Sequence, residues 1–91
     1  MEDSQIIDLY WRREEAAITE TQRKYGAFCY GIAKNILSIH EDAEECVNDT
    51  YHRAWDSIPP QRPAKLRAWL GTVVRNLALN LWNKNHTQKR Y

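Results

Sequence analysis

Asparagine and basic side chains gather near the C-terminal end of the chain. Four asparagines fall between residues 76 and 85, although asparagine is unfavourable in a helix interior, so this grouping calls for a reason. Asparagine amides can hydrogen-bond to base edges, lysine and arginine can neutralise phosphates, and an indole ring can stack on an unpaired base. The pattern therefore predicts nucleic-acid binding; the alternative is a polar helix face with Trp69 in the core. The residues are Arg75, Asn76, Asn80, Asn83, Lys84 and Asn85, next to Trp69 and Trp82.

A second group of polar residues is acidic and lies between residues 41 and 56. At 3.6 residues per turn, Glu45, Asn48, Asp49 and His52 share one outward face of a helix. Further carboxylates crowd the first turn of that helix, where they interact favourably with the helix dipole. This face is either a solvated surface or a docking surface for a basic pair of helices on a partner protein.

The charges of the chain are divided between its two parts. Residues 1–56 contain all twelve acidic residues and six of the thirteen Lys and Arg, a net charge of −6. Residues 57–91 contain the other seven Lys and Arg and no acidic residue, a net charge of +7. An acid-free basic segment suits a polyanion, whereas the acidic part would repel one and suits a basic protein surface. The division predicts two different partners.

The sequence lacks the residue patterns of common catalytic sites. His40, His52 and His86 have no cysteine or carboxylate partners at metal-ligand spacing. No glycine-rich phosphate loop is present, and Cys29 lies on an apolar helix face without an activating base. The carboxylates at 41–45 lack the glycine and the spacing of an EF-hand loop. We therefore expect no enzymatic activity, no cofactor and no metal.

Four helices must position these side chains. Apolar residues recur at steps of three and four, and glycine and proline are few, which favours helices over strands. The prolines cluster in Ile58–Pro63, which predicts a stiff loop. We expect one domain over residues 1–91, a compact all-α bundle of three to four helices. The expected helices are Asp3–Arg13, with an N-cap at Ser4 or Asp3, then Glu14–Leu37, Glu41–Ser57 and Ala64–Asn85, followed by a frayed end at 86–91.

The expected compartment is the cytoplasm. Cys29 and Cys46 lie in apolar helical patterns, which predicts reduced core thiols, since a small secreted domain usually carries more cysteines in pairs. The acidic N-terminus does not have the pattern of a signal peptide, and no apolar run is long enough to span a bilayer. No membrane interaction is therefore expected.

Two long motifs resemble a known family. HEDAEECVNDTYHRAW, from His40 to Trp55, resembles region 2.2 of extracytoplasmic-function sigma factors, where the pattern is roughly DAEDxxQExFxRAW. LRAWLGTVVRNLALN, from Leu66 to Asn80, resembles the following regions 2.3 and 2.4, roughly FRAWLxxIARNxxxD. The stretch from Glu14 to Leu37 is similar to regions 1.2 and 2.1. The motifs occur in the family's order and spacing, and the resemblance covers nearly the whole chain.

The resemblance implies a transcription initiation module with the helical fold of sigma factor region 2. Region 2.2 docks on the clamp helices of the β′ subunit of core RNA polymerase. Regions 2.3 and 2.4, with the loop before them, melt the promoter −10 element and trap a flipped base of the non-template strand. The implied polymerase contacts are Asp42, Glu45, Asn48, Asp49 and His52. The implied DNA contacts are Arg62, Lys65, Arg67, Trp69, Arg75, Asn76, Asn80 and Lys84.

The chain departs from the family pattern at four positions. Asn48 and Asp49 stand where the family usually has the longer Gln and Glu, Tyr51 replaces a Phe, and Asn80 occupies a place often held by Asp. The chain also stops before the family's second domain, region 4, so we expect an excised domain or a stand-alone region 2 protein. An anti-sigma factor, which in this family often covers the same surfaces, is the expected regulator.

Three other functions compete with this one. A helix-turn-helix domain would bind duplex DNA, but the loop at 58–63 is longer than its turn. A helical adaptor with a solvated C-terminal helix would bind no DNA at low salt. A metal-dependent enzyme is the most distant alternative, and it requires a metal that co-purifies with the protein.

Overall fold

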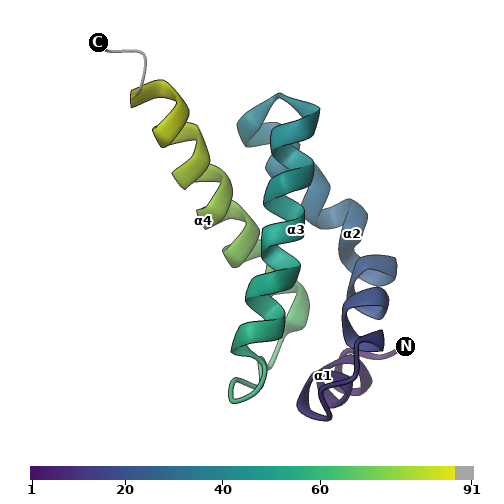
Figure 1. The fold of residues 1–91 in the computed structure, drawn as a ribbon. Coiled ribbons are helices and arrows are strands. Elements are labelled where there is room, and N and C mark those ends of the chain that lie inside the picture. The colour runs from purple at the N-terminus through teal and green to yellow at the C-terminus, as the bar shows by residue number, and fades with distance from the viewer. Residues whose placement is uncertain (88–91) are drawn as a thin grey trace.

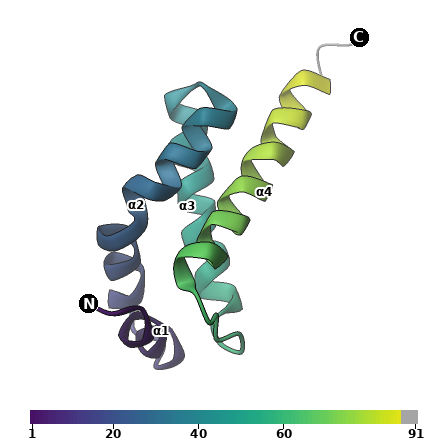
Figure 2. The same ribbon diagram turned by 180° about the vertical axis from the view of Figure 1, so that it is seen from behind.

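The computed structural model describes residues 1–87 and contains four α-helices. Helices α2, α3 and α4 pack against one another, and α1 packs on the N-terminal half of α2 (Figure 1). Helix α3 lies toward the viewer in Figure 1, and α4 lies toward the viewer in the reverse view of Figure 2. No β-strand forms within residues 1–87, so the predicted all-α bundle is confirmed. The helices are α1 (Asp3–Trp11), α2 (Ala16–Leu37), α3 (His40–Ser57) and α4 (Leu66–Thr87).

The ends of α1 differ from the predicted ones for local reasons. Glu2 is the N-cap, and its backbone N–H donates to Oε1 of Gln5 over 2.9 Å, so the predicted cap at Asp3 or Ser4 was wrong. The helix ends at Trp11 because Arg13 adopts a left-handed conformation with φ of 57°, which turns the chain. Helix α2 therefore begins at Ala16, two residues later than predicted.

The other helix ends lie within two residues of the predicted positions. Ser38 is left-handed, with φ of 66°, and ends α2 at Leu37, while α3 begins at His40. Helix α4 begins at Leu66, because the backbone N–H of Trp69 donates to the carbonyl of Lys65 over 3.0 Å and this bond opens the first turn. It continues to Thr87, past the predicted end. Residues 88–91 of the predicted frayed end lie outside the described residues.

The core is formed by one face of each helix. Helix α4 contributes four fully buried residues, Leu66, Leu70, Val74 and Ala78, at a regular spacing of four. Trp69 is half-buried and packs at the edge of the core. Gly71 lets α4 approach α2 closely, since a β-carbon there would lie 3.3 Å from the ring of Phe28.

Both cysteines lie inside this core as free thiols. The thiol of Cys46 on α3 donates to the carbonyl of Val74 on α4 over 3.4 Å. Burial raises the pKa of Cys29 and of Cys46 to about 11, so both stay protonated at neutral pH. The predicted role of these residues as core thiols is confirmed.

Candidate functional site

The outer face of α3 carries the predicted polymerase contacts. Glu45, Asn48, Asp49 and His52 are all exposed, so the helical spacing placed them correctly on one outward surface. Asp42 is different, because it is half-buried and its Oδ2 accepts from the Nδ2 group of Asn85 on α4 over 3.4 Å. Four of the five residues are therefore open to a partner, and the fifth lies at the border with α4.

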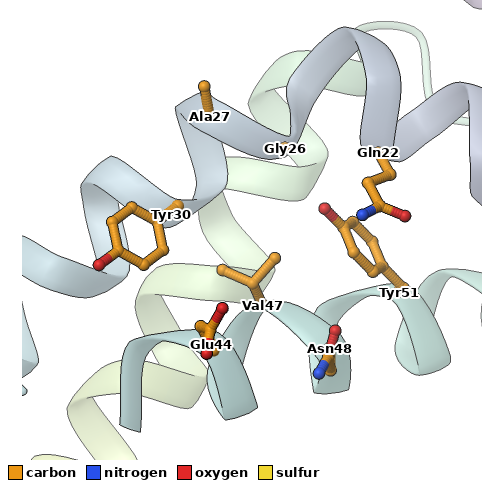
Figure 3. Close-up of a pocket in the computed structure, with 8 residues that line it drawn as sticks. All are labelled: Gln22, Gly26, Ala27, Tyr30, Glu44, Val47, Asn48 and Tyr51. Carbon is orange, nitrogen blue, oxygen red and sulfur yellow. The ribbon is translucent and has the colours of Figure 1, made fainter. Parts of the chain in front are cut away.

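A groove of about 320 Å³ runs between α2 and α3 and opens beside this face. Val47 and Gly26 line it together with several polar side chains, and Ala27 lies at its edge with its methyl group turned away (Figure 3). Among the predicted contacts, only Asn48 lines it. A β-carbon at Gly26 would lie 3.2 Å from the hydroxyl of Tyr51, so glycine keeps this end of the groove open. Sequence reasoning missed the other polar lining residues, which are Gln22, Tyr30, Glu44 and Tyr51.

A histidine holds two of the lining residues in place. The Tyr30 hydroxyl and Nδ1 of His40 are hydrogen-bonded over 2.7 Å, and Nε2 of His40 lies 3.1 Å from a carboxylate oxygen of Glu44. These contacts join the end of α2 to the first turn of α3. The pattern that could have revealed them is the spacing of four between His40 and Glu44, which places the two side chains on one helix face.

The outer face of α4 carries the residues predicted to contact DNA directly. Arg75, Asn76, Asn80 and Lys84 are all exposed, and within residues 1–87 their side chains form no hydrogen bond or ion pair. Trp82 is exposed nearby and stacks on His86, with ring centroids 3.8 Å apart. This face therefore offers two cations and two amides to a ligand.

The loop before α4 and the first turns of α4 are more constrained than the outer face. Arg62 pairs with Asp8 on α1 over 2.9 Å, and the guanidinium of Arg67 lies 4.1 Å from the ring centroid of Phe28. The indole N–H of Trp69 donates to Oε1 of Gln61 over 3.0 Å. Three predicted DNA contacts are thus already engaged within the chain, whereas Lys65 is exposed. Sequence spacing could not show the contacts of Arg62 and Arg67, because their partners lie on α1 and α2.

Two classes of site find no support in residues 1–87. No group of three or more histidine, cysteine or carboxylate side chains is close enough together to hold a metal ion. No helix in this part of the chain is long and apolar enough to cross a membrane. The exposed polar faces of α3 and α4 are the candidate functional surfaces.

Comparison with known proteins identifies one related family. A family model described as Sigma-70 region 2 matches residues 22–88, which includes most of α2 and all of α3 and α4 and leaves α1 outside the match. No curated protein and no solved structure matches the chain.

Proposed function

This chain belongs to the Sigma-70 region 2 family, and we propose that its α3 and α4 surfaces divide the two tasks of that family. Members of the family are non-catalytic initiation factors that bind core RNA polymerase and recognise promoter DNA. The sequence resemblance to sigma factor region 2 is thereby confirmed. The two motifs at 40–55 and 66–80 favour the extracytoplasmic-function group, and action with polymerase favours the cytoplasm as the compartment.

The α3 surface is the proposed polymerase-docking surface. Its exposed carboxylates, Glu45 and Asp49, suit a basic partner such as the clamp helices of the β′ subunit. The groove beside Asn48 combines the apolar side chain of Val47 with several polar side chains, which suits one long basic side chain from that partner. Because Asp42 is already in contact with Asn85, we expect it to contribute less than the other four residues.

The α4 surface, with the loop at 58–65, is the proposed site that captures the non-template strand of the −10 element. Arg75 and Lys84 would neutralise phosphates, and Asn76 and Asn80 would hydrogen-bond to base edges. Trp69 would contact the flipped base. Holding that base offsets the cost of unstacking it, about a few kcal/mol, so binding by itself would favour the open duplex.

The observation that carries the proposal is the separation of the two exposed surfaces by charge. The part of the chain from residue 57 onward has no acidic residue, and the α3 face between residues 41 and 56 is rich in them. A single surface with both characters would repel one of the two partners. Two helices that expose different faces avoid this conflict.

The test measures the two activities in two variants. Asp49→Lys should lower affinity for core RNA polymerase about tenfold or more, since it places a cation against a basic surface. Asn80→Ala should lower affinity for single-stranded DNA about fivefold, in the range expected for a lost base contact. Each variant should keep the other activity. Affinity is measured for core polymerase and for the single strand selected by the wild-type chain from a randomised pool.

Two matched controls make the result specific. Glu15→Lys repeats the charge change on an exposed residue outside α3, and Asn35→Ala repeats the amide deletion on an exposed residue of α2. Both should bind polymerase and DNA as the wild type does. The proposal is wrong if Asp49→Lys and Asn80→Ala match these controls. A clear preference of the wild type for the duplex form of the selected sequence would instead support a helix-turn-helix type of binding.

A further inference from the structure

The turn between α1 and α2 holds the start of the loop that leads to α4. Nη1 of Arg13 donates to the carbonyl of Trp55 over 2.8 Å and to the carbonyl of Ile58 over 3.1 Å. Its guanidinium also lies 3.8 Å from the ring centroid of Trp55. Arg13 therefore satisfies carbonyl groups at the C-terminal end of α3, where no further helical N–H can reach them.

The end of α1 holds the middle of the same loop. The indole N–H of Trp11 donates to the backbone carbonyl of Gln61 over 3.2 Å. The side chain of Gln61 in turn accepts from the indole N–H of Trp69 over 3.0 Å. Gln61 thus connects α1 with the aromatic residue on α4 that the proposed function assigns to the flipped base. Arg62 follows directly and is paired with Asp8 of α1.

The loop needs such external partners because of its composition. Three of its residues are prolines, which donate no backbone hydrogen bond. Two backbone bonds within this segment return to α3: the N–H of Ile58 donates to the carbonyl of Ala54 over 3.0 Å, and the N–H of Gln61 donates to the carbonyl of Ser57 over 2.9 Å. A loop held in its binding conformation before DNA arrives loses less conformational entropy on binding. The contacts from Trp11 and Arg13 supply that restraint.

We propose that Trp11 and Arg13 are positioning residues for DNA capture, acting through Gln61 and the start of the loop. This inference rests on the proposed function and extends it to a segment before residue 22, where the family match begins. Neither residue need touch DNA. They set the position of the loop backbone and, through Gln61, of the Trp69 ring.

The binding experiment uses Trp11→Phe and Arg13→Lys in the full chain. Trp11→Phe keeps an aromatic ring and removes the N–H donor, and Arg13→Lys keeps the charge and removes the guanidinium that bridges two carbonyls. The readout is selectivity, the ratio of affinities for the single strand selected by the wild type and for a scrambled strand of equal composition. We expect each variant to lose about two- to tenfold in this ratio, the range for one hydrogen bond.

A control and two further measurements separate positioning from general stability. Arg12→Lys changes a neighbouring exposed arginine that pairs with Glu14 and has no contact with the loop, and it should keep the wild-type ratio. Affinity for core polymerase should stay at the wild-type value in all three variants. Thermal unfolding identifies any variant that has lost its fold. If Arg13→Lys unfolds, Trp11→Phe still tests the positioning role.

A spectroscopic measurement tests the connection through Gln61 directly. The indole N–H groups of the four tryptophans give separate signals in a nitrogen–proton correlation spectrum, which single Trp→Phe changes assign. In Trp11→Phe, the Trp69 signal should shift while the Trp82 signal, far along α4, stays in place.

The outcomes distinguish this inference from the function on which it rests. If the wild type shows no selectivity between the two single strands, the proposed DNA capture fails and the inference fails with it. If the wild type is selective and Trp11→Phe is equally selective with an unmoved Trp69 signal, only the positioning role is wrong. Reduced selectivity together with a shifted Trp69 signal supports it.

Discussion

The outer faces of α3 and α4 are built in the same way and differ in charge. Each helix buries small and medium apolar residues at a spacing of three or four, such as Ala43 and Val47 on α3 and Leu70 and Val74 on α4. Each helix leaves its opposite face exposed to solvent. On α3 the exposed residues are mainly acidic, whereas on α4 they include basic residues and amides and no acidic residue. The two helices therefore share one core, and the difference in the partners that they suit comes from a few exposed side chains on each helix.

The outer face of α4 and the loop before it differ in how many of their side chains already have a partner. On the outer face of α4, Arg75 and Asn80 have no side-chain partner within residues 1–87 and are free to meet a ligand. In the loop and the first turns of α4, Arg62, Arg67 and Trp69 are held by α1, α2 and Gln61. A ligand that binds at the loop must keep or replace these contacts, so we expect its binding to depend also on the residues of α1 and α2 that hold the loop.

The largest effect is expected from the core that both surfaces share. Leu70 is fully buried, and Leu70→Ala should lower the free energy of unfolding by about 2–5 kcal/mol. Polymerase binding and DNA binding should then fall together on warming. Leu79→Ala makes the same change at an exposed position of α4 and should cost less than about 0.5 kcal/mol. Urea unfolding measures both values, and equal costs would contradict the packing described for α4.

A smaller effect is expected from the buried thiols at high pH. Burial raises the pKa of Cys46 to about 11, above its value in the unfolded chain. The protonated thiol therefore stabilises the fold fully below pH 9, and this contribution is lost as the pH rises from about 9 to about 11. By about pH 10.5 we expect a loss of about 1–2 kcal/mol per thiol. Cys29 should behave in the same way.

The measurement compares the wild type with Cys46→Ala by urea unfolding at neutral and high pH. Other groups also titrate in this range, and burial raises the pKa of Tyr51 to about 12. The difference in pH dependence between the two proteins isolates the thiol. The free energy of unfolding of the variant should fall less at high pH than that of the wild type. If both proteins show the same pH dependence, the protonated Cys46 thiol does not stabilise the contact between α3 and α4.

The smallest effect is expected from a single phosphate contact. Arg75→Gln should lower affinity for single-stranded DNA about threefold at low salt, equally for all sequences, and reduce the slope of log affinity against log salt by roughly 0.7. Arg53→Gln removes an exposed arginine from α3 instead and should leave the slope unchanged. If the two variants lose the same slope, DNA responds to the overall charge of the domain, and the assignment of separate surfaces is wrong.

The sequence by itself determined the helices and the direction in which their residues point. Steps of three and four placed Glu45 and Asp49 outside and Leu70 and Val74 inside, because a residue's position around a helix depends only on its spacing along the chain. The charge division at residue 57 and the two family motifs were equally visible. The end of α1 and the start of α2 were predicted less accurately, since Arg13 turns the chain through a local backbone conformation that residue type predicts weakly.

Only the tertiary structure shows which residues of different helices and loops contact one another. The contact of Asp42 with Asn85, the groove kept open at Gly26, and the hold of Trp11 and Arg13 on the loop all join residues that are distant in the sequence. Such contacts depend on the packing of whole helices around a common core, which periodicity within one helix cannot encode. The exposed side chains therefore indicate the character of the partners, whereas the loop before α4 is held by Trp11 and Arg13, which precede both motifs.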